Sequence, residues 1–394
     1  MTAITKTRIT SIDLLRGIIV VIMALDHSRD FFHKEAFIDD PLNLATTTPF
    51  LYFTRWITHF CAPTFVFLSG VSAWLQSRRK TKKELSRLLI TRGLWLIFLE
   101  VTVINFGIVA DVHFGVTALQ TIWSIGISMF LLGFIIWLPY PLVLATGLLI
   151  VFGHNSLDFA EAARKGNVPF MWHLLHVPGF FPLWSQHSLL ILYPFLSWTG
   201  LMITGYCAGK IFTECEPAAR NKILLYLGIA MLLFFALLRF TNIYGDSLHW
   251  SSQKNGLYTF LSFMNVQKYP PSLLYMCATI GPGLIFISLA GNVKNRFSKI
   301  MIVYGRVPMF YYILHFYTLT TIRILLYTAH GHAFSAGMQG IPNLPFKFLT
   351  PGEGYPLWVA YAIWLLVVMA LYPLCKWYDK YKTAHPEKRW LSYL

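Results

Sequence analysis

Long apolar runs separated by short polar stretches dominate the chain over its whole length. A helix needs about 20 apolar residues to cross the hydrocarbon core of a bilayer, so runs of this length predict membrane spans. The pattern predicts about ten spans; the fifth is short and either forms a hairpin with the fourth or is re-entrant. The predicted spans are residues 12–32, 54–76, 88–109, 120–138, 141–153, 189–212, 223–241, 272–290, 300–327 and 357–375.

Composition supports the same fold class, an all-α polytopic membrane protein with about ten transmembrane helices in one bundle. The 394 residues are 56% hydrophobic and 12% charged, whereas a soluble domain has about 25% charged residues. Disorder and collagen-like repeats are excluded, and an ordinary soluble enzyme is disfavoured. We expect residues 1–394 to form a single transmembrane domain.

The charge distribution predicts the orientation of the bundle. The chain carries 32 Lys and Arg residues against 17 Asp and Glu, a net charge of +15. Most of these cations fall in alternate loops, as the positive-inside rule requires of cytoplasmic loops. The rule places both termini in the cytoplasm, suits a multi-pass protein of a bacterial inner membrane, and explains the charge without a nucleic-acid partner.

Cysteine and histidine usage argues against a metal centre. The five cysteines form no CxxC pair and are interpreted as small core residues. His173 and His176 are three residues apart, as ligands on a helix can be, but no HEXXH arrangement accompanies them, so no metal is expected. Most of the 13 histidines fall on the predicted outer half, which places any proton chemistry there.

The outer end of the first predicted helix is unusually polar. Asp26, His27, Arg29 and Asp30 lie within five consecutive positions at the end of an apolar run. A carboxylate beside a histidine orients the ring and raises its basicity, which suits a general base. We therefore expect His27 to be catalytic, with Asp26 and Asp30 beside it; the alternative is a charged cap that ends the span.

Two other polar pairs lie on early helices. Arg55 and His59 are four residues apart on the second predicted helix, on a face that can meet the Asp26 end of the first. They are candidates for substrate binding, or for a structural salt bridge between the helices. Asp13 and Arg16 share a face near the cytoplasmic end, where Arg16 can also bind an anion.

Single ionisable residues within apolar spans are functional candidates because burying them in a membrane is costly. Glu100 lies midway along the third predicted span and His315 near the middle of the ninth. Glu100 is expected to have a partner such as Arg16, Arg306 or His315, and either residue can position substrate. The structural alternatives are an ion pair for Glu100 and a hydrogen-bonded core position for His315.

Three motifs resemble a known family. Residues 8–17 (RITSIDLLRG) resemble the opening signature of the heparan-α-glucosaminide N-acetyltransferase-like transmembrane acyltransferases. Residues 62–70 (APTFVFLSG) resemble their second-helix signature, and residues 304–306 (YGR) resemble a late-helix motif. The resemblance extends from the first helix to the last.

The resemblance implies an acetyl transfer from cytoplasmic acetyl-CoA to an amino sugar or another glycan or small acceptor on the outer side. It implies a catalytic histidine near the outer end of the early helices, at His27 or, in the following loop, at His33. Related proteins suggest a homodimer. CoA phosphates would need cations at the inner face. The expected donor-binding residues are Arg8, Asp13, Arg16, Arg78, Arg79 and Arg306.

The rival interpretation of the chain is a transporter or flippase of a small polar or lipid-linked substrate.

Overall fold

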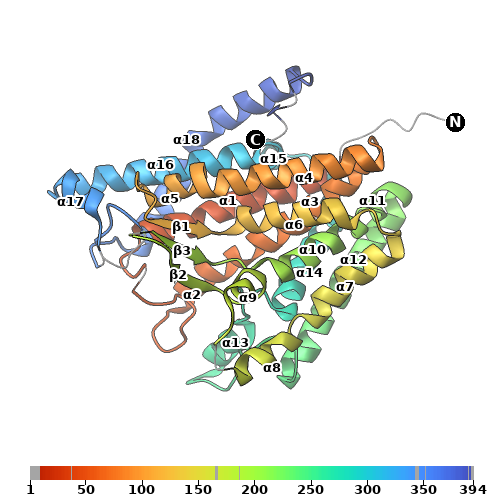
Figure 1. Cartoon of the computed structure of the whole chain (residues 1–394), viewed down its shortest axis with the longest axis horizontal. Coiled ribbons are helices and arrows are strands. Elements are labelled where there is room, and N and C mark those ends of the chain that lie inside the picture. The colour runs from red at the N-terminus through yellow and green to blue at the C-terminus, as the bar shows by residue number, and fades with distance from the viewer. Residues whose placement is uncertain are drawn as a thin grey trace.

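A computed structural model of the chain shows a bundle of helices with a small sheet at one end (Figure 1). It describes residues 9–36, 38–164, 167–185, 187–341, 346–350, 352–388 and 390–391. Most of the longer helices run along the long axis of the molecule (Figure 1).

Each of the ten predicted spans contains a helix, although several are shorter than predicted. The longer elements are α1 (Thr10–Phe32), α3 (Cys61–Ser77), α4 (Lys82–Leu99), α6 (Thr121–Ile135), α7 (Tyr140–Gly153), α10 (Phe195–Ala208), α12 (Pro217–Thr241), α14 (Leu273–Leu289), α15 (Arg296–Arg306), α16 (Pro308–Ala329) and α18 (Leu357–Ala384). The shorter ones are α2 (Pro49–Trp56), η1 (Ile57–Phe60), η2 (Glu100–Ile104), α5 (Asn105–Val109), α8 (Ser156–Ala163), α9 (Phe170–Leu175), α11 (Ile211–Glu214), α13 (Gly256–Met264), η3 (Ala290–Asn292) and α17 (Phe334–Gln339).

Within the described residues, five helical segments are long and apolar enough to cross a membrane, or six if the bent pair α7 and α8 forms one span. Helices α6 and α14 are apolar but shorter. The chain is therefore a mostly helical, multi-pass membrane protein, while the count of about ten spans and the placement of the termini stay predictions. The five qualifying segments are Pro49–Ser77, Lys82–Val109, Pro217–Thr241, Pro308–Ala329 and Leu357–Ala384.

The purely helical fold class is corrected by a three-stranded sheet. Its strands are β1 (Val116–Leu119), β2 (Gly179–Pro182) and β3 (Ser188–Ile191), in the order β1-β3-β2. Strand β3 pairs in parallel with β1 and antiparallel with β2. Each strand has only four residues, too few for a clear periodic signal in a sequence dominated by helical runs.

The ninth predicted span is two helices. Helix α15 ends at Arg306, and α16 begins at Pro308 after a single residue, Val307. Proline has no backbone N–H and its ring clashes with the preceding turn, so it starts a helix readily but does not continue one. The break separates the arginine from the aromatic helix that carries His315.

Helices α1 and α15 touch backbone to backbone. A Cβ added to Gly17 would lie 1.8 Å from the carbonyl oxygen of Met301, and one added to Gly305 would lie 1.8 Å from that of Asp13. Small residues allow such close approach between membrane helices. Glycine pairs also meet where α3 crosses α10, α4 crosses α6 and α12 crosses α14; they are Gly70 and Gly205, Gly93 and Gly126, and Gly228 and Gly281.

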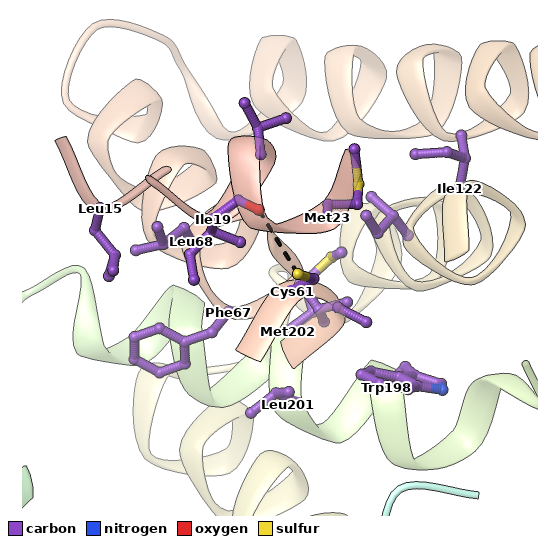
Figure 2. Close-up of a cluster of buried hydrophobic side chains, with 14 of the residues drawn as sticks. Leu15, Ile19, Met23, Cys61, Phe67, Leu68, Ile122, Trp198, Leu201 and Met202 are labelled. Carbon is purple, nitrogen blue, oxygen red and sulfur yellow. Dashed lines mark hydrogen bonds between the residues drawn. The ribbon is translucent and has the colours of Figure 1, made fainter. Parts of the chain in front are cut away.

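The core is built around α1, which packs against α3, α14, α15, α16 and α18. Figure 2 shows Ile19 and Met23 of α1 among side chains of α3 and α10, with the Cys61 thiol donating to the Ile19 carbonyl oxygen at 3.6 Å. All five cysteines are free. Four of them are buried, as their interpretation as core residues predicted, and Cys215 is half-buried.

Replacing Gly305 by alanine should destabilise the bundle. The added methyl group collides with backbone atoms of α1, so the two helices must separate, at a cost of about 1–3 kcal/mol or more. Thermal unfolding of the purified protein should show a clear drop in Tm. Gly256→Ala is the matched control, because a Cβ at Gly256 meets nothing within 4 Å; equal Tm values for the two variants would contradict the close contact.

Candidate active site

The last turns of α1 carry a compact network of ion pairs. Asp26 contacts Arg29 at 2.9 Å and Arg55 of α2 at 2.5 Å. Asp30 contacts Arg29 at 2.5 Å. The prediction that the Arg55 face meets the Asp26 end of α1 is confirmed. Two carboxylates, of which Asp30 is half-buried, are matched by two guanidinium groups, so the network as a whole is neutral, and neutral groupings are how ionic side chains persist in apolar surroundings.

His27 contacts a second histidine rather than a carboxylate. Its Nδ1 lies 2.7 Å from Nε2 of His315, and Nδ1 of His315 lies 3.3 Å from the carbonyl oxygen of Tyr311. A carbonyl oxygen only accepts, so Nδ1 of His315 carries the proton and donates to it, and Nε2 of His315 accepts from Nδ1–H of His27. Nε2 of His27 is then left with a lone pair. The neighbouring ring of Phe316 stacks on His27 with centroids 4.3 Å apart.

A cavity of about 340 Å³, called here the His27 cavity, opens beside this histidine. Strands β1 and β3 contribute Ala118 and Leu190 to its wall. Its polar and aromatic lining includes Asp26, His27, Asp30, Arg55, Thr58, Gln120, Thr121, Tyr193, Lys268, Tyr269, Tyr312 and Phe316. It therefore combines ionised groups of both signs with aromatic faces, which suits a polar ligand.

Lys268 and Tyr269 reach the His27 cavity from the loop between α13 and α14. Burial alone would raise the pKa of Tyr269, but the positive charges of Lys268 and Arg55 outweigh it and hold this pKa below its ordinary value. The Tyr269 hydroxyl lies 3.5 Å from that of Tyr193. Sequence reasoning missed these residues because nothing in a short loop indicates that it folds over a helix end.

A second cavity of about 310 Å³, called here the Arg16 cavity, lies toward the other end of α1. Arg16 donates to Ser72 at 3.1 Å and contacts Asp13 at 3.5 Å, while Arg306 contacts Asp379 at 3.1 Å. The basic residues that line it are Arg16, Arg92, Arg306 and Lys382. Such a concentration of cations suits a phosphorylated ligand.

The two cavities adjoin. Both are lined by the same four side chains, Met23, Phe65, Thr121 and Tyr312. The cationic site and the histidine site therefore lie on opposite sides of a thin partition inside the bundle, and α1 contributes to both.

The predicted donor-binding residues divide into those that line the Arg16 cavity and those that do not. Arg16 and Arg306 line it, and Asp13 pairs with Arg16. Arg78 and Arg79 lie exposed in the turn after α3, and Arg8 lies outside the described residues. Sequence reasoning missed the roles of Arg92 and Lys382; the signal for Arg92 was its place within an apolar helix.

Three of the four predicted substrate-binding residues, His59, Glu100 and His315, are absent from the cavity linings formed by the described residues, and only Arg55 is among them. Glu100 is fully buried, and its Oε2 accepts from the backbone N–H of Trp123 at 3.0 Å, so it caps the N-terminus of α6. The prediction that Glu100 pairs with a residue such as Arg16, Arg306 or His315 was wrong. His59 is buried against Tyr275, whose hydroxyl donates to the His59 carbonyl oxygen at 2.8 Å.

His33, the alternative catalytic histidine, caps the C-terminus of α1 and pairs with Tyr355 in an isolated bridge. Burial lowers its pKa below the ordinary value. It lines two smaller pockets and is absent from the residues that line the His27 cavity in the described part of the chain. The geometry therefore favours His27.

Residues 8–238, more than half of the chain, match the sequence pattern of the heparan-α-glucosaminide N-acetyltransferase catalytic family. The chain belongs to this family. The match includes Arg16, His27 and Arg92, while Arg306 and His315 follow it in the sequence. A search of curated proteins finds no match. Family membership implies transferase activity in a multi-pass membrane protein.

Removing Arg55 should destabilise the histidine end of the bundle. Arg55→Met leaves Asp26 with Arg29 as its cationic contact, and breaking a buried pair in this way costs about 3–5 kcal/mol when nothing compensates; Arg29 should keep the loss near the lower limit. The double variant Asp26→Asn with Arg55→Met should recover part of the lost Tm. Additive effects of the two substitutions in a double-mutant cycle would show that the pair does not interact.

Proposed function

We propose that the chain is a membrane acetyltransferase that uses acetyl-CoA as donor and acetylates an amino sugar, or another glycan or small acceptor, in the His27 cavity. The observation that carries the proposal is the adjoining pair of cavities, one cationic and one containing a histidine with an available lone pair. Family membership supports the chemistry.

The donor fits the Arg16 cavity. Guanidinium groups of Arg16, Arg92 and Arg306 suit the phosphates of CoA because they bind phosphate oxygens through paired, charge-assisted hydrogen bonds. The acyl-bearing arm would pass between Met23, Phe65, Thr121 and Tyr312 to reach His27. Enclosure by these side chains would keep water from the thioester.

The acceptor fits the His27 cavity. Nε2 of His27 takes a proton from the amine or hydroxyl of the acceptor as that group attacks the thioester carbonyl carbon. The carbon–sulfur bond then breaks, and the departing thiolate receives the proton from the His27 imidazolium, giving free CoA and the acetylated product. His315 holds the ring and its tautomer. Asp30, half-buried at the rim, can pair with an amine of the acceptor.

The proposal also orients the protein. The loops rich in Lys and Arg predict a cytoplasmic location for the end of the bundle that holds Arg16, and an outer location for the end that holds His27. The donor would then enter from the cytoplasm of a bacterium and the acceptor from the outer side of its inner membrane.

Transport or flipping of a small polar or lipid-linked substrate is the second candidate, since adjoining cavities also form a path across a bundle. The two functions differ in their need for CoA. Uptake of glucosamine into proteoliposomes without CoA would favour transport, whereas release of free CoA only when an amino sugar is present would favour the enzyme.

His27→Ala should abolish transfer without loss of donor binding. Losing a general base costs about 10²–10⁴-fold in rate, and the substitution leaves the Arg16 cavity intact. Release of the CoA thiol, with acetyl-CoA and a panel of amino sugars including glucosamine, measures the effect. His33→Ala is the control and should retain activity. Full activity of His27→Ala would overturn the assignment.

Arg92→Ala should weaken CoA binding about tenfold, the loss expected for one charge-assisted phosphate contact. Stabilisation of the protein against heating at increasing CoA concentrations reports the affinity. Arg87 lies on the same helix but is exposed and outside the cavity lining, so Arg87→Ala should bind CoA normally. Equal losses in both variants would show that the effect is general electrostatic attraction.

A further inference from the structure

A second group of ionisable side chains lies apart from both cavities, where α8 meets α9. Asp158 and Glu161 are three residues apart on α8, and His176 follows the last residue of α9. One ligand atom from each, two carboxylate oxygens and a ring nitrogen, lie within 4.8 Å of one another. At this spacing, small shifts of the side chains would bring all three ligand atoms onto one metal ion.

Each of the three side chains is held by a neighbour. Asn155 donates to Oδ2 of Asp158 at 2.8 Å, and the indole of Trp172 donates to Oε1 of Glu161 at 2.6 Å. His176 is fully buried, with its Nε2 3.1 Å from Nδ1 of His154. Metal-binding side chains are usually oriented by such a second set of hydrogen bonds.

The charges of the group are unbalanced. Two carboxylates lie close together, and among the described residues the only basic side chain that pairs with either is His176, whose Nδ1 is 2.6 Å from Oε1 of Glu161. Like charges at this distance disfavour each other's ionised form. A protonated His176 would neutralise one negative charge, whereas a divalent cation would neutralise both.

The histidine pair behind the group is compatible with a bound metal. With a metal on Nδ1 of His176, its Nε2 would carry a proton and donate to Nδ1 of His154. His154 is 3% exposed, and its own Nε2 has no hydrogen-bond partner among the described residues. His154 would therefore fix the tautomer of the ligand, as outer hydrogen-bond partners do in known metal sites.

We propose that Asp158, Glu161 and His176 bind one divalent transition-metal ion, for which Zn²⁺ is the best match. An imidazole with two carboxylates suits Zn²⁺, with water completing the shell, while Ca²⁺ and Mg²⁺ prefer oxygen ligands alone. This departs from the expectation that the chain holds no metal, which rested on His173 and His176. Nδ1 of His173 instead faces the carbonyl oxygens of Val177 and Pro178.

The bound ion would act as a structural clamp. It would tie α8 to the end of α9, which leads directly into β2, and β2 pairs with β3, whose Leu190 lines the His27 cavity. The clamp would steady the wall of that cavity without touching the reacting atoms, so the proposal does not depend on the acetyl transfer.

Zinc binding by the full-length chain, purified without a histidine tag and stripped with EDTA, tests the proposal. Titration calorimetry should show one Zn²⁺ site that Ca²⁺ does not fill, and bound Zn²⁺ should raise Tm. Glu161→Gln and Asp158→Asn keep the size of the side chain and an oxygen that can accept from Trp172 or Asn155. Each should weaken binding at least tenfold, because even the loss of an outer hydrogen-bond partner of a ligand typically costs about 10–100-fold in metal affinity.

His173→Ala is the matched control, because His173 lies one turn earlier on α9 and outside the group; it should bind Zn²⁺ as the unsubstituted protein does. Co²⁺ gives an independent readout, since its visible absorption should change in Glu161→Gln but not in His173→Ala. Absence of zinc binding, or equal affinity in Glu161→Gln, Asp158→Asn and the unsubstituted protein, would overturn the proposal.

Discussion

The backbone contact of Gly17 with α15, and of Gly305 with α1, sets the positions of both cavities. It brings α15 so close to α1 that Arg16 lies 3.5 Å from the carbonyl oxygen of Gly305, and Arg16 and Arg306 line the same cavity. Since α16 follows α15 after a single residue, the same contact carries His315 to His27 at the other. Gly17 and Gly305, which belong to two of the motifs that resemble the family, therefore determine how the candidate site is assembled.

Helix α1 sets the distance between the two parts of the site. Arg16 and His27 are eleven residues apart, which corresponds to about 16 Å along a helix that rises 1.5 Å per residue. Met23 lies between them and contributes to both cavities. The separation means that a donor anchored near Arg16 needs an extended arm to deliver a group to His27. Ion pairs hold the His27 end of α1 in place: Asp26 pairs with Arg29 and Arg55, and Asp30 pairs with Arg29.

Sequence patterns predicted the features that depend on neighbouring residues in the chain. Apolar runs located the helices, and the prediction that the second helix meets the Asp26 end of the first placed Arg55 correctly, whereas His59, predicted on the same face, lies against Tyr275. The polar end of α1 does line a cavity. The same reasoning could not find the partner of His27, because His315 is 288 positions away in the sequence. Nor could it foresee that Glu100 caps α6, since the free end of a helix attracts a carboxylate only once the two helices are packed together.

A donor held among the arginines would have to reach the histidine between the side chains that separate the two cavities. An experimental structure with CoA bound would reveal its path. We expect the CoA phosphates beside Arg16, Arg92 and Arg306. The acyl-bearing arm of CoA should pass Met23 and Tyr312 and place its sulfur close enough to His27 for the reacting atoms of a bound acetyl group and an acceptor to lie about 3–3.5 Å apart. CoA bound outside the Arg16 cavity, or with its sulfur turned away from the partition, would contradict this path.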